Sequence, residues 1–204
     1  MEAFRAAQRD EKFSYAEVGA SERGAPAGYN LDHNRVRLGS GDADFSAACA
    51  ALRAWRMFPA PWTSITPNTE PIAVGKVVAM QARALGLWWL NACRIVYVID
   101  ETTPAAKPLE RGNPPNESER ERVVRRFGFA YGTLPAHVEQ GEERFSVEQL
   151  ADGSVWYDLR AFSRPRFWPV RLAKPVARAL QRRFVRESLA AMQRAVRGGV
   201  STNA

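Results

Sequence analysis

The stretch that decides the fold reads ERFSVEQLADGSVWYDLRAFS and covers residues 143–163. Apolar side chains occupy every second position on both sides of Asp152-Gly153, which is the periodicity of strands with one buried face. An Asp-Gly pair between two such runs is typical of a tight β-turn. The stretch therefore predicts a β-hairpin whose buried face carries Phe145, Val147, Val155, Tyr157, Leu159 and Ala161.

Other segments have the alternation or the β-branched content of strands, and two have the apolar spacing of helices. An N-cap at Asp42 and the spacing after it predict a helix over residues 42–58. A longer helix is expected over residues 170–197, with Pro175 either kinking it or marking its true start. The further strands expected are His33–Leu38, Thr63–Thr69, Val74–Leu85, Asn91–Thr102 and Phe127–Leu134.

This order of elements predicts an α+β fold, in which a sheet of about six or seven antiparallel strands packs on the long C-terminal helix. Such a sheet needs one face covered, and an amphipathic helix can cover it. We expect one domain over residues 29–197, after an irregular arm at 1–28 and before a disordered tail at 198–204. Residues 104–126 are rich in proline and charge, so they are predicted to form a mobile loop.

The composition suits a globular protein of 204 residues, with 46% hydrophobic residues and a net charge of +7. Two cysteines, Cys49 and Cys93, exclude a disulfide scaffold and suit a reducing compartment. The N-terminus has no apolar block, and the most apolar stretch, residues 85–99, is too short to cross a bilayer. We therefore expect a cytoplasmic protein with no transmembrane segment.

The charge gathers near the C-terminus, where residues 160–197 carry eleven Lys or Arg against one acid, Glu187. Arg178, Arg182 and Arg186 are four residues apart and form one ridge of the predicted helix. The ridge is a candidate anion-binding surface, for example for anionic lipid head groups. A solvated helix face is the favoured interpretation of the ridge, and the lack of an aromatic RNA-binding motif argues against a nucleic-acid partner.

The densest polar cluster is a candidate acid–base site. His137, Glu139 and Glu143 fall in phase with the buried positions of the strand that follows, provided that Gly141 does not reset the alternation. A histidine beside a partly desolvated carboxylate can exchange protons near neutral pH. The alternative is that Gly141 begins a tight turn with solvated carboxylates on its flanks. The candidate catalytic residues are Tyr131, His137, Glu139, Glu143 and Tyr157.

Other chemistries have weaker signals. His137 and Glu139 with Glu143 resemble part of a metal-ligand set, but His33 is the only other histidine, so no metal site is predicted. No motif indicates a cofactor, and none resembles the nucleophile elbow of hydrolases. Both cysteines fall on expected buried faces, where they pack as small hydrophobes.

The order of elements resembles the helix-grip architecture of the START and birch-pollen-allergen superfamily, in which a curved sheet wraps a C-terminal helix around an apolar cavity. The sequence itself resembles the domain-of-unknown-function family 1990, also called the uncharacterised protein family 0548. Ala136 departs from the glycine expected there, and the 104–126 loop is longer than usual. The matching blocks are FSYAEVGAS (13–21), NRVRLGSG (34–41), LRAWRMF (52–58), CRIVYVID (93–100), GFAYGTLPAHVEQGEERFSVE (128–148), GSVWYDLRAFSRP (153–165) and QRRFVRESLAAM (181–192).

The family resemblance implies no activity, so three hypotheses come from the residues. The first is a module that binds a small hydrophobic or amphipathic molecule beneath the alanine-rich stripe of the last helix, residues 173–195. The second is an enzyme on the same scaffold, a hydrolase, dehydratase or cyclase that uses the acid–base cluster. The third is binding to an anionic surface or to nucleic acid through the basic C-terminal helix. The expected cavity residues are Phe129, Phe145, Val147, Leu159, Leu180 and Phe184.

Overall fold

The computed structural model describes residues 1–24, 26–84, 86–102, 120–166 and 174–200. One antiparallel sheet has the strand order β1-β7-β6-β5-β4-β3-β2, so β1 and β2 form its two edges. The elements are α1 (Glu2–Ala7), the 3-10 helix η1 (Ala20–Glu22), β1 (Asn30–Ser40), α2 (Gly41–Arg53), β2 (Thr63–Thr66), β3 (Val77–Ala84), β4 (Leu87–Thr102), β5 (Val123–Thr133), β6 (Glu139–Leu150), β7 (Ser154–Pro165) and α5 (Lys174–Val200).

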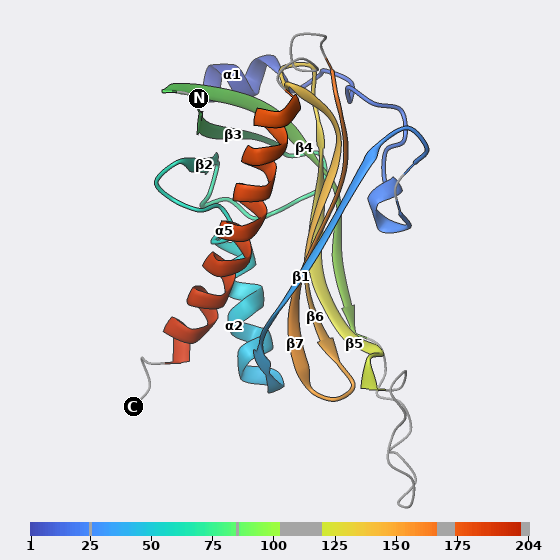
Figure 1. The fold of residues 1–204 in the computed structure, drawn as a ribbon, viewed down its shortest axis with the longest axis vertical. Coiled ribbons are helices and arrows are strands. Elements are labelled where there is room, and N and C mark those ends of the chain that lie inside the picture. Colours follow the sequence, from blue (N-terminus) through green and yellow to red (C-terminus); the bar gives the residue numbers. More distant parts are fainter. Residues whose placement is uncertain (25, 85, 103–119, 167–173, 201–204) are drawn as a thin grey trace, which may run out of the picture.

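Figure 1 shows the strands curving beside α5, with α2 next to the C-terminal half of that helix. The predicted hairpin is confirmed, since β6 and β7 pair in antiparallel fashion with Val147 opposite Tyr157. The α+β fold, the sheet of seven antiparallel strands and the helix after the first strand are confirmed as well. None of the described helices is long and apolar enough to cross a bilayer.

The core lies where α2 and the C-terminal half of α5 meet the sheet. Met192 and Val196 of α5 and Leu52 of α2 are almost fully buried there, in one cluster with the sheet residues. Burial of such side chains is the main stabilising contribution to folding. The sheet residues that share this cluster and have no exposed surface are Cys93, Phe129, Phe145, Val147, Val155, Tyr157 and Leu159.

The opposite face of β6 and β7 carries charges that neutralise one another. Asp158 is buried between Arg144, at 2.9 Å, and His33, at 2.6 Å. Burial on its own raises the pKa of Asp158, but the hydrogen bonds and charges of these two partners outweigh it, so the pKa lies below its usual value. Asp158 therefore belongs to a structural ion-pair network on the far side of the sheet from the candidate acid–base cluster.

The N-terminal arm is held against this outer face by Glu142. The carboxylate of Glu142 accepts hydrogen bonds from the Tyr15 hydroxyl at 2.7 Å and from the backbone N–H groups of Gly19 and Ser21 at 2.8 and 3.1 Å. The Ser21 hydroxyl donates a further bond to it. The prediction of an irregular arm over residues 1–28 is thus wrong in part, because α1 and η1 are helical and the arm is anchored.

Several predicted boundaries also need correction. The expected loop over 104–126 overlaps β5, which begins at Val123 and pairs Arg126 with Glu101 of β4. Residues 103–119 lie outside the described part. The helix over 42–58 ends at Arg53, since Trp55 adopts a left-handed φ of 56° that turns its ring toward Phe129. The last helix includes residues 198–200 of the expected tail. Residues 170–173 of the expected helix lie outside the described part, so whether Pro175 starts or kinks the helix stays a prediction.

Replacing Glu142 with alanine should release the arm and leave several buried donors without an acceptor. We expect the free energy of unfolding to fall by at least about 2 kcal/mol in urea titration, because each buried unpaired group costs about 1–3 kcal/mol. The control is Glu22→Ala, an exposed change for which a loss within about 0.5 kcal/mol is expected. Equal losses in the two variants would contradict the anchoring role.

Candidate functional site

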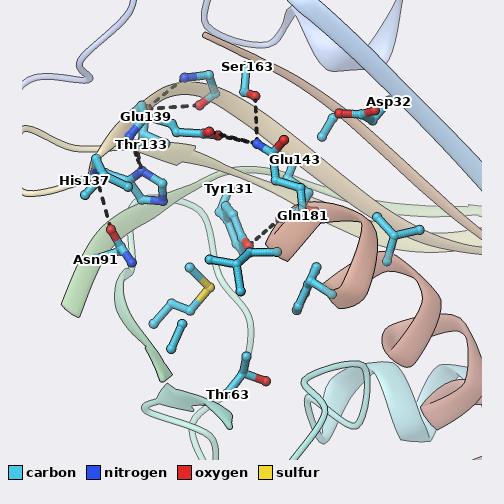
Figure 2. Close-up of a pocket in the computed structure, with 18 of the residues that line it drawn as sticks. Asp32, Thr63, Asn91, Tyr131, Thr133, His137, Glu139, Glu143, Ser163 and Gln181 are labelled. Carbon is cyan, nitrogen blue, oxygen red and sulfur yellow. Dashed lines mark hydrogen bonds between the residues drawn. The ribbon is translucent and has the colours of Figure 1, made fainter. Parts of the chain in front are cut away.

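A cavity of about 630 Å³ lies between the N-terminal half of α5 and the sheet. It adjoins the core, because the lining residues Phe184 and Val185 of α5 also pack against the core cluster. Figure 2 shows labelled polar side chains from β5, β6 and α5 turned toward one another at this cavity. Most of the remaining wall is apolar, formed by Trp62, Met80, Ala82, Ala84, Trp89, Leu159, Ala161, Leu180, Phe184 and Val185.

The polar end of the cavity is built on a cross-strand pair, Tyr131 of β5 and Glu143 of β6. The Tyr131 hydroxyl donates a hydrogen bond to Glu143 Oε2 at 2.6 Å. Burial raises the pKa of Glu143 to about 7, although the bond from Tyr131 acts in the opposite direction. Burial also raises the pKa of Tyr131, so the phenol keeps its proton and remains the donor. Glu143 can therefore gain or lose a proton near neutral pH.

Glu139 lies four residues before Glu143 on β6 and faces the same cavity. The side-chain amide of Gln181 on α5 donates to both of its carboxylate oxygens, at 2.8 and 2.7 Å. Burial raises the pKa of Glu139, while the hydrogen bonds from Ser163 and Gln181 partly offset that effect. Gln181 thus joins the helix to the polar end of the cavity.

His137 lines the cavity from the turn between β5 and β6, not from the strand phase predicted for it. The Glu139 backbone N–H donates to His137 Nδ1 at 2.9 Å, and the Glu139 carbonyl oxygen lies 3.2 Å from the same nitrogen. The shorter contact favours Nδ1 as the acceptor, with the proton on Nε2. Burial lowers the pKa of His137 to about 4, so the ring is neutral at physiological pH. Within the described part of the chain, Nε2 has no hydrogen-bond partner, and its N–H is available to a ligand.

Sequence reasoning missed two residues that position this turn. The buried amide of Asn91 accepts a bond from the Val138 backbone at 3.4 Å. The Thr133 hydroxyl accepts a bond from Gly141 N–H at 3.0 Å. A polar residue inside an apolar strand is the only signal that marked Asn91 in the sequence. Gly141 itself lies within β6 opposite Ser163, so the alternative of a tight turn with solvated flanks is wrong.

Some predicted site residues lie elsewhere. Tyr157 is fully buried, and its hydroxyl lies 3.1 Å from the Ser188 hydroxyl in the core, so it does not line the cavity. Phe129, Phe145 and Val147 are also core residues and not cavity walls. Strand phase assigned all four to the correct face, but they lie in the core and not at the cavity. The predicted lining residues that do border the cavity are Leu159, Leu180 and Phe184.

The predicted anion-binding arginines divide into two kinds. Arg178 forms a two-pronged ion pair with Asp32 of β1, at 2.6 and 3.0 Å, so its charge is already compensated. Arg182 and Arg186 are exposed and border a smaller cavity of about 280 Å³ beside β1. Binding of these two arginines to an anionic surface stays a prediction. In the described ranges, no three His, Cys, Asp or Glu side chains are grouped so as to hold a metal ion.

The pKa of Glu143 predicts how stability depends on pH. Because this pKa is about 7 in the folded protein and 4.5 ordinarily, the folded state binds the proton more tightly. The contribution of Glu143 to the free energy of unfolding is therefore complete below pH 4.5 and is lost as the pH rises through 7. Glutamine does not titrate, so Glu143→Gln avoids this loss. The free energy of unfolding of the variant, relative to that of the wild type, should rise by up to about 3 kcal/mol between pH 4.5 and 8.

The measurement is urea unfolding of both proteins across that pH range, where the difference between them cancels the titration of all other groups. Glu121→Gln, a change at an exposed residue, is the control and should give a constant difference. A constant difference for Glu143→Gln would mean that its carboxyl is solvated.

Comparisons with known proteins place the chain in a family. Residues 14–191 match the family described as a domain of unknown function, DUF1990. A UPF0548 protein of Dictyostelium discoideum is 32% identical over 206 residues, covering 93% of this chain and 88% of the relative. A UPF0548 protein of Deinococcus radiodurans is 36% identical over 197 residues, covering 90% of this chain and 87% of the relative.

Solved structures share the fold at low sequence identity. The Zhui aromatase/cyclase of Streptomyces sp. R1128 superposes with a TM-score of 0.53 at 13% identity, covering 85% of this chain and 97% of that protein. TTHA0849 of Thermus thermophilus gives a TM-score of 0.51 at 11% identity, covering 84% of this chain and all of that protein. The chain thus belongs to the DUF1990 or UPF0548 family, and its fold is the helix grip expected from its sequence.

Proposed function

We propose that the protein binds a small hydrophobic or amphipathic molecule in the cavity between the sheet and α5. The observation that carries this proposal is a space of about 630 Å³ with mainly apolar walls and polar groups gathered around Glu143. Apolar walls with a few convergent polar groups are typical of small-molecule sites. The wall supplies affinity, and the polar end sets the orientation of the molecule.

The helix α5 is bonded to residues at both edges of the sheet, and these contacts support the proposal that the cavity beneath it stays open. Arg178 pairs with Asp32 on the edge strand β1. On the other side, the Trp62 indole donates to Glu187 at 2.6 Å just before the edge strand β2, and Arg183 stacks on the Trp62 ring. These contacts hold α5 across the curved sheet, so it does not collapse onto the small side chains below.

The small side chains of the wall offer a direct test. Ala82 of β3 lines the cavity, and Ala82→Phe would fill part of the space with an aromatic ring. We expect this variant to bind the neutral apolar dye Nile red at least about tenfold more weakly than the wild type, measured by fluorescence titration. Ser64→Phe, on the exposed side of the neighbouring strand β2, should leave the affinity unchanged. No dye binding by the wild type, or equal binding by all three proteins, would refute the proposal.

A second candidate function is acid–base catalysis on a molecule held in the same cavity. The observation in its favour is that Glu143 has a pKa of about 7 and is hydrogen-bonded to Tyr131. A general acid or base works best when its pKa is close to the working pH. The neutral His137 ring, with its N–H free, would stabilise negative charge on a substrate oxygen. Hydrolysis, dehydration and cyclisation all fit these roles.

For hydrolysis, the probe is p-nitrophenyl decanoate, an apolar chromogenic ester. Turnover should follow one ionisation near pH 7, and Glu143→Gln should lower kcat by about 10²- to 10⁴-fold and remove that pH dependence. Nile red binding by the variant controls for an intact cavity. Unchanged kcat in the variant would exclude Glu143 as the catalytic group.

A further inference from the structure

Among the described residues, the polar end of the cavity is lined by acidic and not by cationic side chains. Its lining includes the acids Asp32, Glu139, Glu142 and Glu143, and none of its described lining residues is Lys or Arg. The carboxylate of Glu142 lies on the other face of β6, bonded to the N-terminal arm. A molecule entering this cavity therefore meets carboxyl groups and a neutral histidine.

The other three carboxyl groups, those of Asp32, Glu139 and Glu143, differ in the number of partners they have. Asp32 is paired with Arg178, which is not itself a lining residue, and Glu139 accepts two bonds from Gln181. Glu143 accepts one bond, from Tyr131 to Oε2, and Oε1 has no partner among the described side chains and backbone groups. A carboxyl oxygen that lines an apolar cavity without a donor is the natural contact for a donor on the ligand.

We propose that the cavity takes up apolar amines, with the ammonium group donating to Glu143 Oε1 and the apolar part lying along Leu180 and Phe184. This inference rests on the proposed ligand-binding function and adds the charge of the ligand to it. The ammonium supplies a positive charge that the described lining lacks, and pairing lowers the cost of burying either charge. An apolar carboxylate of the same size would instead add a negative charge next to Glu139 and Glu143.

The proposal predicts a definite pH dependence. The ionisable groups around Glu143 are Tyr131 of β5, Cys93 of β4, Tyr157 of β7, Glu139 of β6, Asp32 of β1 with its partner Arg178 of α5, and His137 of the turn. Binding of an ammonium requires an ionised carboxyl, so the amine displaces the Glu143 proton. Its affinity should fall about tenfold per pH unit below the pKa of Glu143 and level off above it.

The experiment compares three ten-carbon probes that differ only in the polar group, namely decylamine, decanol and decanoate. Each probe is titrated against Nile red bound to the wild type at pH 8, at concentrations below micelle formation. We expect decylamine to bind at least about tenfold more tightly than decanol, and decanoate to bind most weakly. Glu143→Gln should reduce decylamine to the affinity of decanol, whereas the control Glu121→Gln should preserve the preference.

A second variant keeps the test decisive if Glu143→Gln folds poorly. Tyr131→Phe retains the carboxyl but removes its hydrogen bond, which raises the pKa of Glu143 further. The amine preference should persist, with its pH midpoint shifted upward. Decanol that binds as tightly as decylamine, or a preference for decanoate, overturns the inference and leaves the ligand-binding proposal standing. Failure of all three probes and of Nile red to bind overturns both.

Discussion

The hydrogen bond from Tyr131 to Glu143 places a carboxyl group inside an apolar space, and the chemistry of the cavity depends on it. Gly141 makes this geometry possible, because its φ of 151° and its close approach to the Phe162 carbonyl leave no room for a side chain. Beyond that glycine, Glu142 points to the outer face and anchors the N-terminal arm. Glu143 points into the cavity, so two adjacent acids on β6 have different roles.

The helix α5 both packs on the core and covers the cavity. The C-terminal half of α5, with Met192 and Val196, packs in a single core cluster with α2 residues and the sheet. The N-terminal half contacts both sheet edges through Arg178 and Glu187 and leaves a gap over the middle strands. The difference follows from side-chain volume, because phenylalanines fill the sheet beside α2, whereas alanines occupy much of β3 beneath the gap.

The alternation of residues along β6 and β7 was enough to predict the hairpin, the buried face and the inward direction of Glu139 and Glu143. It was not enough to separate core from cavity, because strand phase defines a face but not a position along it. Tyr157 was therefore assigned to the site, although its hydroxyl lies beside Ser188 in the core.

Contacts between segments far apart in the chain were also beyond sequence reasoning. The bonds of Asn91 to the turn at Val138 and of Arg178 to Asp32 leave no local pattern. They arise because the sheet and the helix bring distant residues together. The order of the predicted elements indicated the architecture, whereas the chemistry of the cavity follows from the geometry around Glu143.

The most direct measurement is an NMR titration of the glutamate side-chain carboxyl carbons in the full-length protein, with Glu143→Gln used to assign the resonance. One glutamate should titrate near pH 7 and disappear from the spectrum of the variant. If the resonance that disappears titrates at the ordinary pKa of about 4.5, Glu143 is solvated and the cavity has no buried acid.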